Sequence, residues 1–190
     1  MRKFIGVLLM VVVVGGFVWM TKEQMVGKDE NGKSILKTSR KVYDATAEIE
    51  KISKQIEKEY PKRPEEVVEI HNKLMEICYR YPMDEKDVEK YVKIIRQLYT
   101  NKFNELNAEE AQIAALNKER QTMSSEKMEL VISEITGVYV AQNEKGEEIS
   151  AEVNVMYATN LGGLSRTYLL TDENGVWKIN GWEDNQIEEQ

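Results

Sequence analysis

The chain has 190 residues, enough for one domain of ordinary size and a short additional segment. With 42% hydrophobic and 31% charged residues, its composition is that of a folded protein and excludes a disordered chain. The whole chain has a net charge of −7. Its first 22 residues hold three basic residues and no acidic one, which leaves 23 basic and 33 acidic residues, a net charge of −10, in the rest. A body this acidic repels a phosphate backbone, and we expect no nucleic-acid partner.

An uncharged apolar run, Phe4–Met20, follows two basic residues at the start of the chain. As a helix this run would be about 25 Å long, the short end of what spans a bilayer. The positive-inside rule would then keep the basic residues in the cytoplasm and leave everything after Met20 outside. We therefore predict a single-pass membrane anchor over residues 1–21. A cleaved signal peptide, which would give a secreted protein, stays open because Gly15 and Gly16 offer small residues for cleavage.

Residues 22–41 are polar, mixed in charge and without sustained apolar periodicity. We predict that they form a stalk between the membrane and a domain over residues 42–185, and that residues 186–190 form a short tail.

The first part of the predicted domain has apolar residues three and four positions apart, which is the period of amphipathic helices. We expect four helices. One begins near Ala45, and Pro64, followed by two acidic residues, opens the second. Asp84 opens the third, and Asn107 with Glu110 resembles a capping box that opens the fourth.

From about Met128 the sequence takes the pattern of β-strands, with Gly137 as a predicted bulge or bend. Four strands separated by short turns predict an antiparallel meander. Helices followed by strands indicate the α+β class, with helices packed on one face of a curved four-stranded antiparallel sheet. In the second strand, apolar and polar residues alternate, and the residues predicted to face the helices are Ile149, Ala151, Val153, Val155 and Tyr157.

The single histidine and the single cysteine, His71 and Cys78, lie seven positions apart on one helical face. Two helical turns separate them by about 10.5 Å along the axis, so the two side chains cannot bond directly. Both fall in the apolar stripe of the second helix, which favours a place in the core for each. One histidine and one cysteine do not make a usual zinc site, and no common catalytic, metal or phosphate-binding motif occurs, so we predict no cofactor and no metal.

Three aromatic residues of the predicted strands, Tyr157, Tyr168 and Trp177, are expected to face the same space between helices and sheet as His71. Such a space is either a filled aromatic core or a ligand cavity with polar groups at its base. The sequence leaves both readings open, and these four residues are the candidate cavity lining.

Two stretches of the chain, YPKRPEEVVEIHNKLMEICYRY and DENGVWKINGW, resemble bacterial members of the nuclear-transport-factor-2-like superfamily, and most closely a membrane-anchored group from Gram-positive bacteria. Relatives in that group tend to have a hydroxyl residue where Arg63 stands. The resemblance implies a cone-shaped fold, with helices laid across a bent antiparallel sheet. Some relatives use the cone as isomerases or dehydratases, whereas others bind ligands or assemble through their sheets. The residues that carry the likeness are Tyr60, Pro61, Pro64–Val68, Gly175, Trp177, Ile179, Gly181 and Trp182.

We therefore expect a membrane-tethered extracytoplasmic domain without a catalytic set, which binds an unidentified protein or small molecule or pairs as a homodimer through its sheet. The alternative is a small-molecule isomerase or lyase that uses His71 as its base. No catalytic carboxylate is identified, because the inward strand positions recognised in the sequence are apolar or aromatic.

Overall fold

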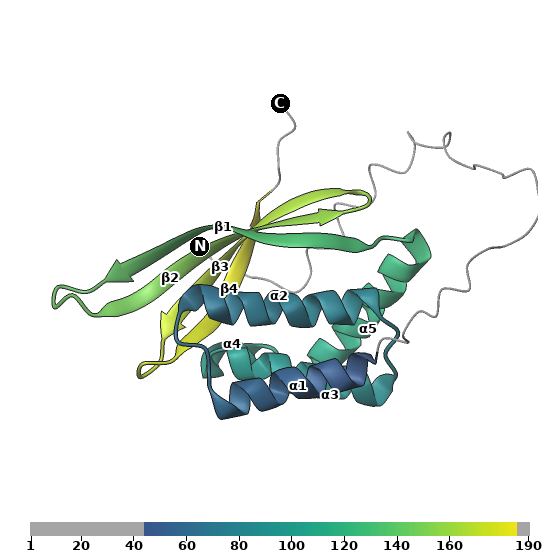
Figure 1. Ribbon diagram of the computed structural model, residues 1–190, viewed down its shortest axis with the longest axis horizontal. Coiled ribbons are helices and arrows are strands. Elements are labelled where there is room, and N and C mark those ends of the chain that lie inside the picture. The colour runs from purple at the N-terminus through teal and green to yellow at the C-terminus, as the bar shows by residue number, and fades with distance from the viewer. Residues whose placement is uncertain (1–43, 186–190) are drawn as a thin grey trace, which may run out of the picture.

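The computed structural model describes residues 44–185, which form helices followed by a sheet (Figure 1). The predicted anchor, stalk and C-terminal tail lie outside these residues. Within the described part, no helix is both long and apolar enough to cross a membrane. The elements in chain order are α1 (Ala45–Lys58), α2 (Pro64–Arg80), α3 (Glu85–Ile95), η2 (Arg96–Leu98), α4 (Asn101–Leu106), α5 (Glu109–Glu126), β1 (Leu130–Gln142), β2 (Glu148–Thr159), β3 (Gly162–Asp172) and β4 (Trp177–Asn185).

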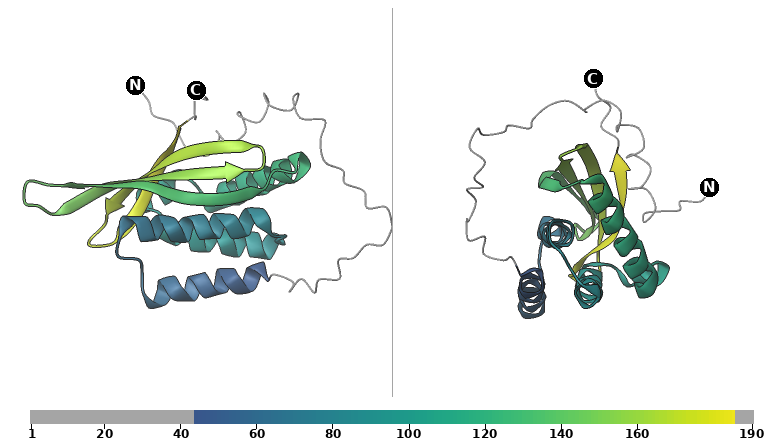
Figure 2. Two further views of the ribbon diagram at one scale, coloured as in Figure 1. Left: turned by 45° about the horizontal axis from the view of Figure 1, so that its top comes forward. Right: turned by 90° about the vertical axis from the view of Figure 1, so that its right-hand side faces the viewer.

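The four strands form one antiparallel sheet in the order β1-β2-β3-β4, so the predicted α+β class and the meander are confirmed. Helices cover one face of the sheet, with α2 against the strands and α1 on the far side of α2 (Figure 2). The β1–β2 hairpin extends beyond the helices (Figure 1).

Helices α2 and α3 begin at capping residues that can be recognised in the sequence. The Glu66 carboxylate accepts hydrogen bonds from the N–H groups of Lys62 and Arg63, ahead of Pro64 in the first turn of α2. Asp84 and Asp87 form a reciprocal capping box at α3.

The start predicted for the last helix was wrong. Asn107 ends α4, and its Nδ2 donates to the carbonyl of Phe103 at 2.8 Å. α5 begins at Glu109, after Ala108 as N-cap. The additional helix α4 is only 6 residues long, too short to show a helical period, and Thr100 caps it through a bond from the Phe103 N–H.

The alternation in β2 is confirmed, because Ala151, Val153, Val155 and Tyr157 are all buried. Ile149 was predicted to share their environment but is 45% exposed. Ile149 is the second residue of β2, next to the hairpin turn, and the β1–β2 register shift between Ala141 and Gln142 leaves it without a partner on β1. A bulge of this kind interrupts the alternation of inward and outward side chains. Gly137 does mark a bulge, since the β1–β2 register shifts between Ile135 and Gly137.

Candidate functional site

His71 lies in the middle of α2 and is only 2% exposed. Its two ring nitrogens each face a tyrosine hydroxyl: Nε2 is 3.1 Å from that of Tyr99 and Nδ1 is 3.2 Å from that of Tyr168. Burial, with the nearby charge of Arg166 as a smaller cause, lowers the pKa of His71 to about 3. The imidazole is therefore neutral at physiological pH, with one donor and one acceptor nitrogen.

The hydrogen bonds continue from His71 through two strands. The hydroxyl oxygens of Tyr168 and Tyr157 are 2.6 Å apart, and Tyr157 donates to Oδ1 of Asn72. Because Tyr157 gives its one proton to Asn72, Tyr168 must donate to Tyr157 and accept from His71. This order places the proton of His71 on Nδ1 and makes Nε2 the acceptor for Tyr99. The chain of bonds satisfies every buried hydroxyl along it, as a filled core requires.

A buried ion pair lies next to this chain. The guanidinium of Arg166 binds both carboxylate oxygens of Asp184, at 2.6 and 3.0 Å, across the β3–β4 pair. The side chain of Arg166 is 5% exposed and that of Asp184 is 23% exposed. Burial alone would lower the pKa of Arg166, but Tyr168 and Asp184 outweigh this and raise it, so the guanidinium stays charged.

Aromatic rings surround the Arg166 guanidinium. Its carbon is 5.0 Å from the ring centroid of Trp182 and 5.8 Å from those of Tyr157 and Tyr168, within the range of cation–π attraction. Trp182 is also 6.1 Å from the ring of His71. We call these residues the polar-aromatic cluster: His71, Asn72, Tyr99, Tyr157, Arg166, Tyr168, Trp182 and Asp184.

Glu119 of α5 lies close enough to Arg166 and Asp184 to interact with their charges. Burial raises its pKa, while a hydrogen bond with Tyr79 and the positive charge of Arg166 act in the opposite direction. Glu119 thus lies beside the cluster, and its carboxyl group holds a proton more readily than that of a free glutamate.

The structure brings three of the four candidate residues together, namely His71, Tyr157 and Tyr168. Trp177 lies elsewhere in the core, 4% exposed, and its carbonyl accepts a hydrogen bond from the Tyr60 hydroxyl at 3.0 Å. The indole beside His71 is that of Trp182. Cys78 is 1% exposed, and burial raises the pKa of its thiol to about 12.

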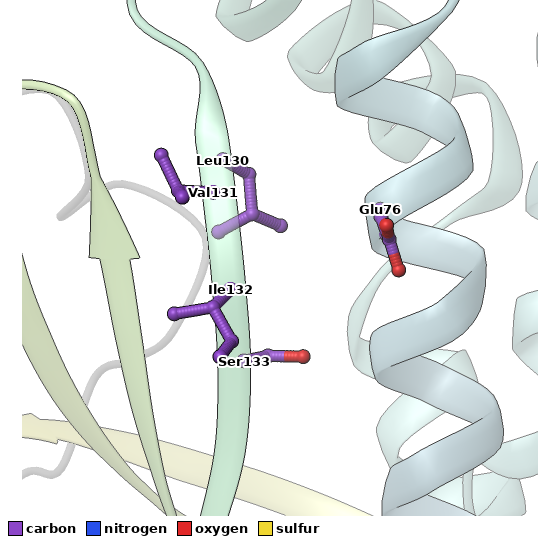
Figure 3. Close-up of a pocket in the computed structure, with 5 residues that line it drawn as sticks. All are labelled: Glu76, Leu130, Val131, Ile132 and Ser133. Carbon is purple, nitrogen blue, oxygen red and sulfur yellow. The ribbon is translucent and has the colours of Figure 1, made fainter.

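A small pocket of about 130 Å³ opens outside this cluster, between α2 and the start of β1 (Figure 3). Glu76 lines one side and residues 130–133 line the other. Nothing in the cluster borders it. Within residues 44–185, no group of three or more His, Cys, Asp or Glu side chains is placed to hold a metal ion.

The comparison with protein families adds one match: the family described as "Domain of unknown function (DUF6715)" matches residues 1–182. The chain belongs to this family. The match spans the apolar segment and the polar stretch as well as nearly all of the α+β part, so these regions occur together in DUF6715. No curated protein and no solved structure matches the chain.

Five cluster residues of this DUF6715 chain were not predicted from the sequence as site residues: Asn72, Tyr99, Trp182, Asp184 and Arg166. Of these, Arg166 could have been found. Its position had a readable signal, because Arg166, Tyr168 and Leu170 alternate along β3 and all three are buried. A charged residue in an inward series predicts a buried ion pair. Its partner Asp184 had no such signal, since the bulge between Leu169 and Leu170 shifts the register of β4.

Proposed function

We propose that this protein is a membrane-tethered extracytoplasmic binding or assembly domain, held to the membrane by a helix over residues 1–21. The observation that carries the tether is the joint occurrence, in one family match, of the apolar run Phe4–Met20 and the α+β domain. An uncharged run of this length behind basic residues fits a single-pass anchor with its N-terminus in the cytoplasm. Secretion after signal cleavage is the alternative that the same segment allows.

The packing of the domain supports binding rather than catalysis. His71, the base of the isomerase or lyase alternative, is buried between two tyrosine hydroxyls and has its pKa lowered to about 3. A general base works best with a pKa near the operating pH and within reach of its substrate. The polar-aromatic cluster is therefore proposed as a structural core, and recognition is assigned to the surface.

A cone-shaped nuclear-transport-factor-2-like fold is part of this proposal. It is supported by the helix-then-sheet order and by a contact between the two stretches that carry the resemblance. The Tyr60 hydroxyl in the first stretch donates to the Trp177 carbonyl in the second, and the Lys178 ammonium lies 4.1 Å from the centroid of the Tyr60 ring. A homodimer through the sheet is the form of assembly that the resemblance favours.

Two treatments of cells producing the full chain test the placement. Membranes washed in alkaline carbonate should retain the protein, and trypsin added to intact cells should remove the α+β domain. If the protein is washed off the membranes while its domain stays protected from trypsin, the proposal is wrong. Release of a shortened chain into the medium would instead establish the secreted alternative.

A further inference from the structure

The two edge strands of the sheet, β1 and β4, differ in what their outer main-chain groups bind. At the β4 edge, Tyr99 bridges to Ile179, and the Thr100 N–H donates to the Ile179 carbonyl at 2.9 Å. At the β1 edge, Arg80 donates to the carbonyls of Leu130 and Val131, both at 3.3 Å. Beyond them, within residues 44–185, the main chain of β1 pairs only with β2. The rest of β1 thus has an open row of N–H and C=O groups.

This open edge also exposes apolar side chains on both faces of the sheet. Val138 and Val140 pair with buried residues of β2 and so lie on the helix-facing side, at 39% and 41% exposure. Tyr139 points to the other face and is 64% exposed. Five of the nine large apolar side chains that are exposed in the described residues belong to β1. Natural edge strands are commonly protected by lysine or proline, and β1 has neither.

The surroundings of this edge are acidic. Residues 129–159, which cover the β1–β2 hairpin, hold six acidic residues and one basic residue, a net charge of −5. Glu134 is the single charged residue on β1 itself, and Glu144 and Glu147 lie in the turn of the hairpin, next to Lys145. Two such hairpins would repel each other, so this charge disfavours a second copy of the chain and favours a basic partner.

We propose that β1 binds an extended, positively charged polypeptide segment of a partner protein, which adds to the sheet as a fifth strand beside residues 132–142. Main-chain bonds to the open edge give affinity, and apolar side chains of the added strand contact Val138, Tyr139 and Val140. Basic side chains of the partner face the glutamates of the hairpin. The pocket between Glu76 and residues 130–133 lies beside the start of this edge and offers room for a side chain (Figure 3). This inference rests on the binding function proposed above and names the class of partner.

A defined peptide tests the proposal. The full chain, purified in dodecyl maltoside, is titrated with the fluorescein-labelled peptide KVTVKVTVK, and binding is followed by fluorescence anisotropy. The comparison peptides are EVTVEVTVE, which reverses the charge, and KVTPKPTVK, which cannot donate main-chain bonds at two positions. We expect saturable binding of the first peptide, weakened several-fold by added salt, and at least about tenfold weaker binding of the other two.

Matched variants locate the binding site. Tyr139→Lys and Met156→Lys both place a lysine at an exposed apolar position of the sheet, but Met156 lies on β2, away from the edge. Tyr139→Lys should weaken peptide binding about tenfold and Met156→Lys no more than about twofold. Both variants should keep the far-ultraviolet spectrum and the melting temperature of the wild type, because both positions are exposed.

Four results would overturn the proposal: equal binding of the basic and acidic peptides, no binding of KVTVKVTVK, equal effects of the two variants, or a dimer by light scattering that Tyr139→Lys dissociates. The last result would assign the edge to a second copy of this chain. None of these measurements depends on where the protein resides. If the peptide does not bind as expected but trypsin removes the domain from intact cells, the edge-strand proposal is wrong and the tethered placement still holds.

Discussion

Arg166 and Asp184 lie opposite each other on neighbouring strands, and both hydrogen bonds of their bidentate pair are within 3.0 Å. The pair lies at the border of the core, with the guanidinium under the rings of three aromatic residues and the carboxylate partly open to solvent. A charge buried this deeply is tolerated only while its partner is present.

Removing the carboxylate should therefore be costly. Asp184→Ala leaves the Arg166 guanidinium buried without its partner, and we expect a loss of about 3 kcal/mol in the free energy of unfolding. The double variant Arg166→Met with Asp184→Ala should recover part of this loss. Urea unfolding of the full chain in detergent, followed by tryptophan fluorescence, measures both.

The control for this prediction is Arg63→Met, which removes ion pairs to Glu65 and Glu66 on the surface of α2. The Arg63 side chain is 65% exposed, so its loss should cost far less stability than the loss of the Asp184 carboxylate. Equal costs for Arg63→Met and Asp184→Ala would show that the buried pair has no special role.

The pH dependence of stability should report on His71. Its pKa is about 3 in the folded protein, against about 6.5 when unfolded. Between these values the unfolded chain binds the proton and the folded one does not, so this contribution is complete above pH 6.5 and is lost as the pH falls. Lowering the pH from 7.5 to 5.5 should cost about 1.4 kcal/mol through this residue.

The comparison is with His71→Gln, which keeps a donor and an acceptor but does not titrate. Glu119 and the other carboxyl groups contribute equally to both proteins, so the difference between their pH dependences isolates the imidazole. Parallel stability curves for the wild type and His71→Gln would contradict a buried neutral histidine.

The strand register predicts a contrast between neighbouring residues. Val155→Asp puts a carboxylate at a position with 0% exposure and should cost at least about 3 kcal/mol. Asn154→Asp, on the opposite face, keeps an oxygen that accepts from the Thr167 hydroxyl and should cost about 1 kcal/mol or less. The melting temperatures of the two variants measure this contrast. Similar losses of stability in both would mean that the assigned register is wrong.

Cys78 should be unreactive in the folded protein. It is 1% exposed and its thiol pKa is raised to about 12, so almost no thiolate is present at pH 8. Ellman's reagent should titrate no thiol in the native chain and one thiol per chain in urea. Rapid modification without denaturant would contradict the packing of α2 against the sheet.

Much of this architecture could be predicted because periodicity and caps are local. Pro64 and Asp84 mark real helix starts, and the alternation from Ala151 to Tyr157 gives the buried face of β2. The exposure of Ile149 could not be read in the same way, because it depends on the β1–β2 register shift between Ala141 and Gln142.

The cluster was predicted less completely because it depends on pairing between strands. The bulge between Leu169 and Leu170 shifts the β4 register and brings Trp182 opposite Tyr168, so Trp182 and not Trp177 lies next to His71. An inward-facing Arg166 could have been recognised from alternation alone, whereas its bond to Asp184 needed the three-dimensional register.

The central claim is that the α+β domain lies outside the cytoplasm on a membrane tether, and labelling of a single introduced cysteine tests it most directly. Cys78 is buried and should not react with a maleimide in the folded protein. Glu144→Cys, in the exposed turn of the hairpin, therefore adds the one accessible thiol of the described residues. A membrane-impermeant maleimide should label Glu144→Cys on intact cells, but should label Lys3→Cys only after the cells are lysed. Labelling of Lys3→Cys on intact cells, with Glu144→Cys labelled only after lysis, would contradict the account.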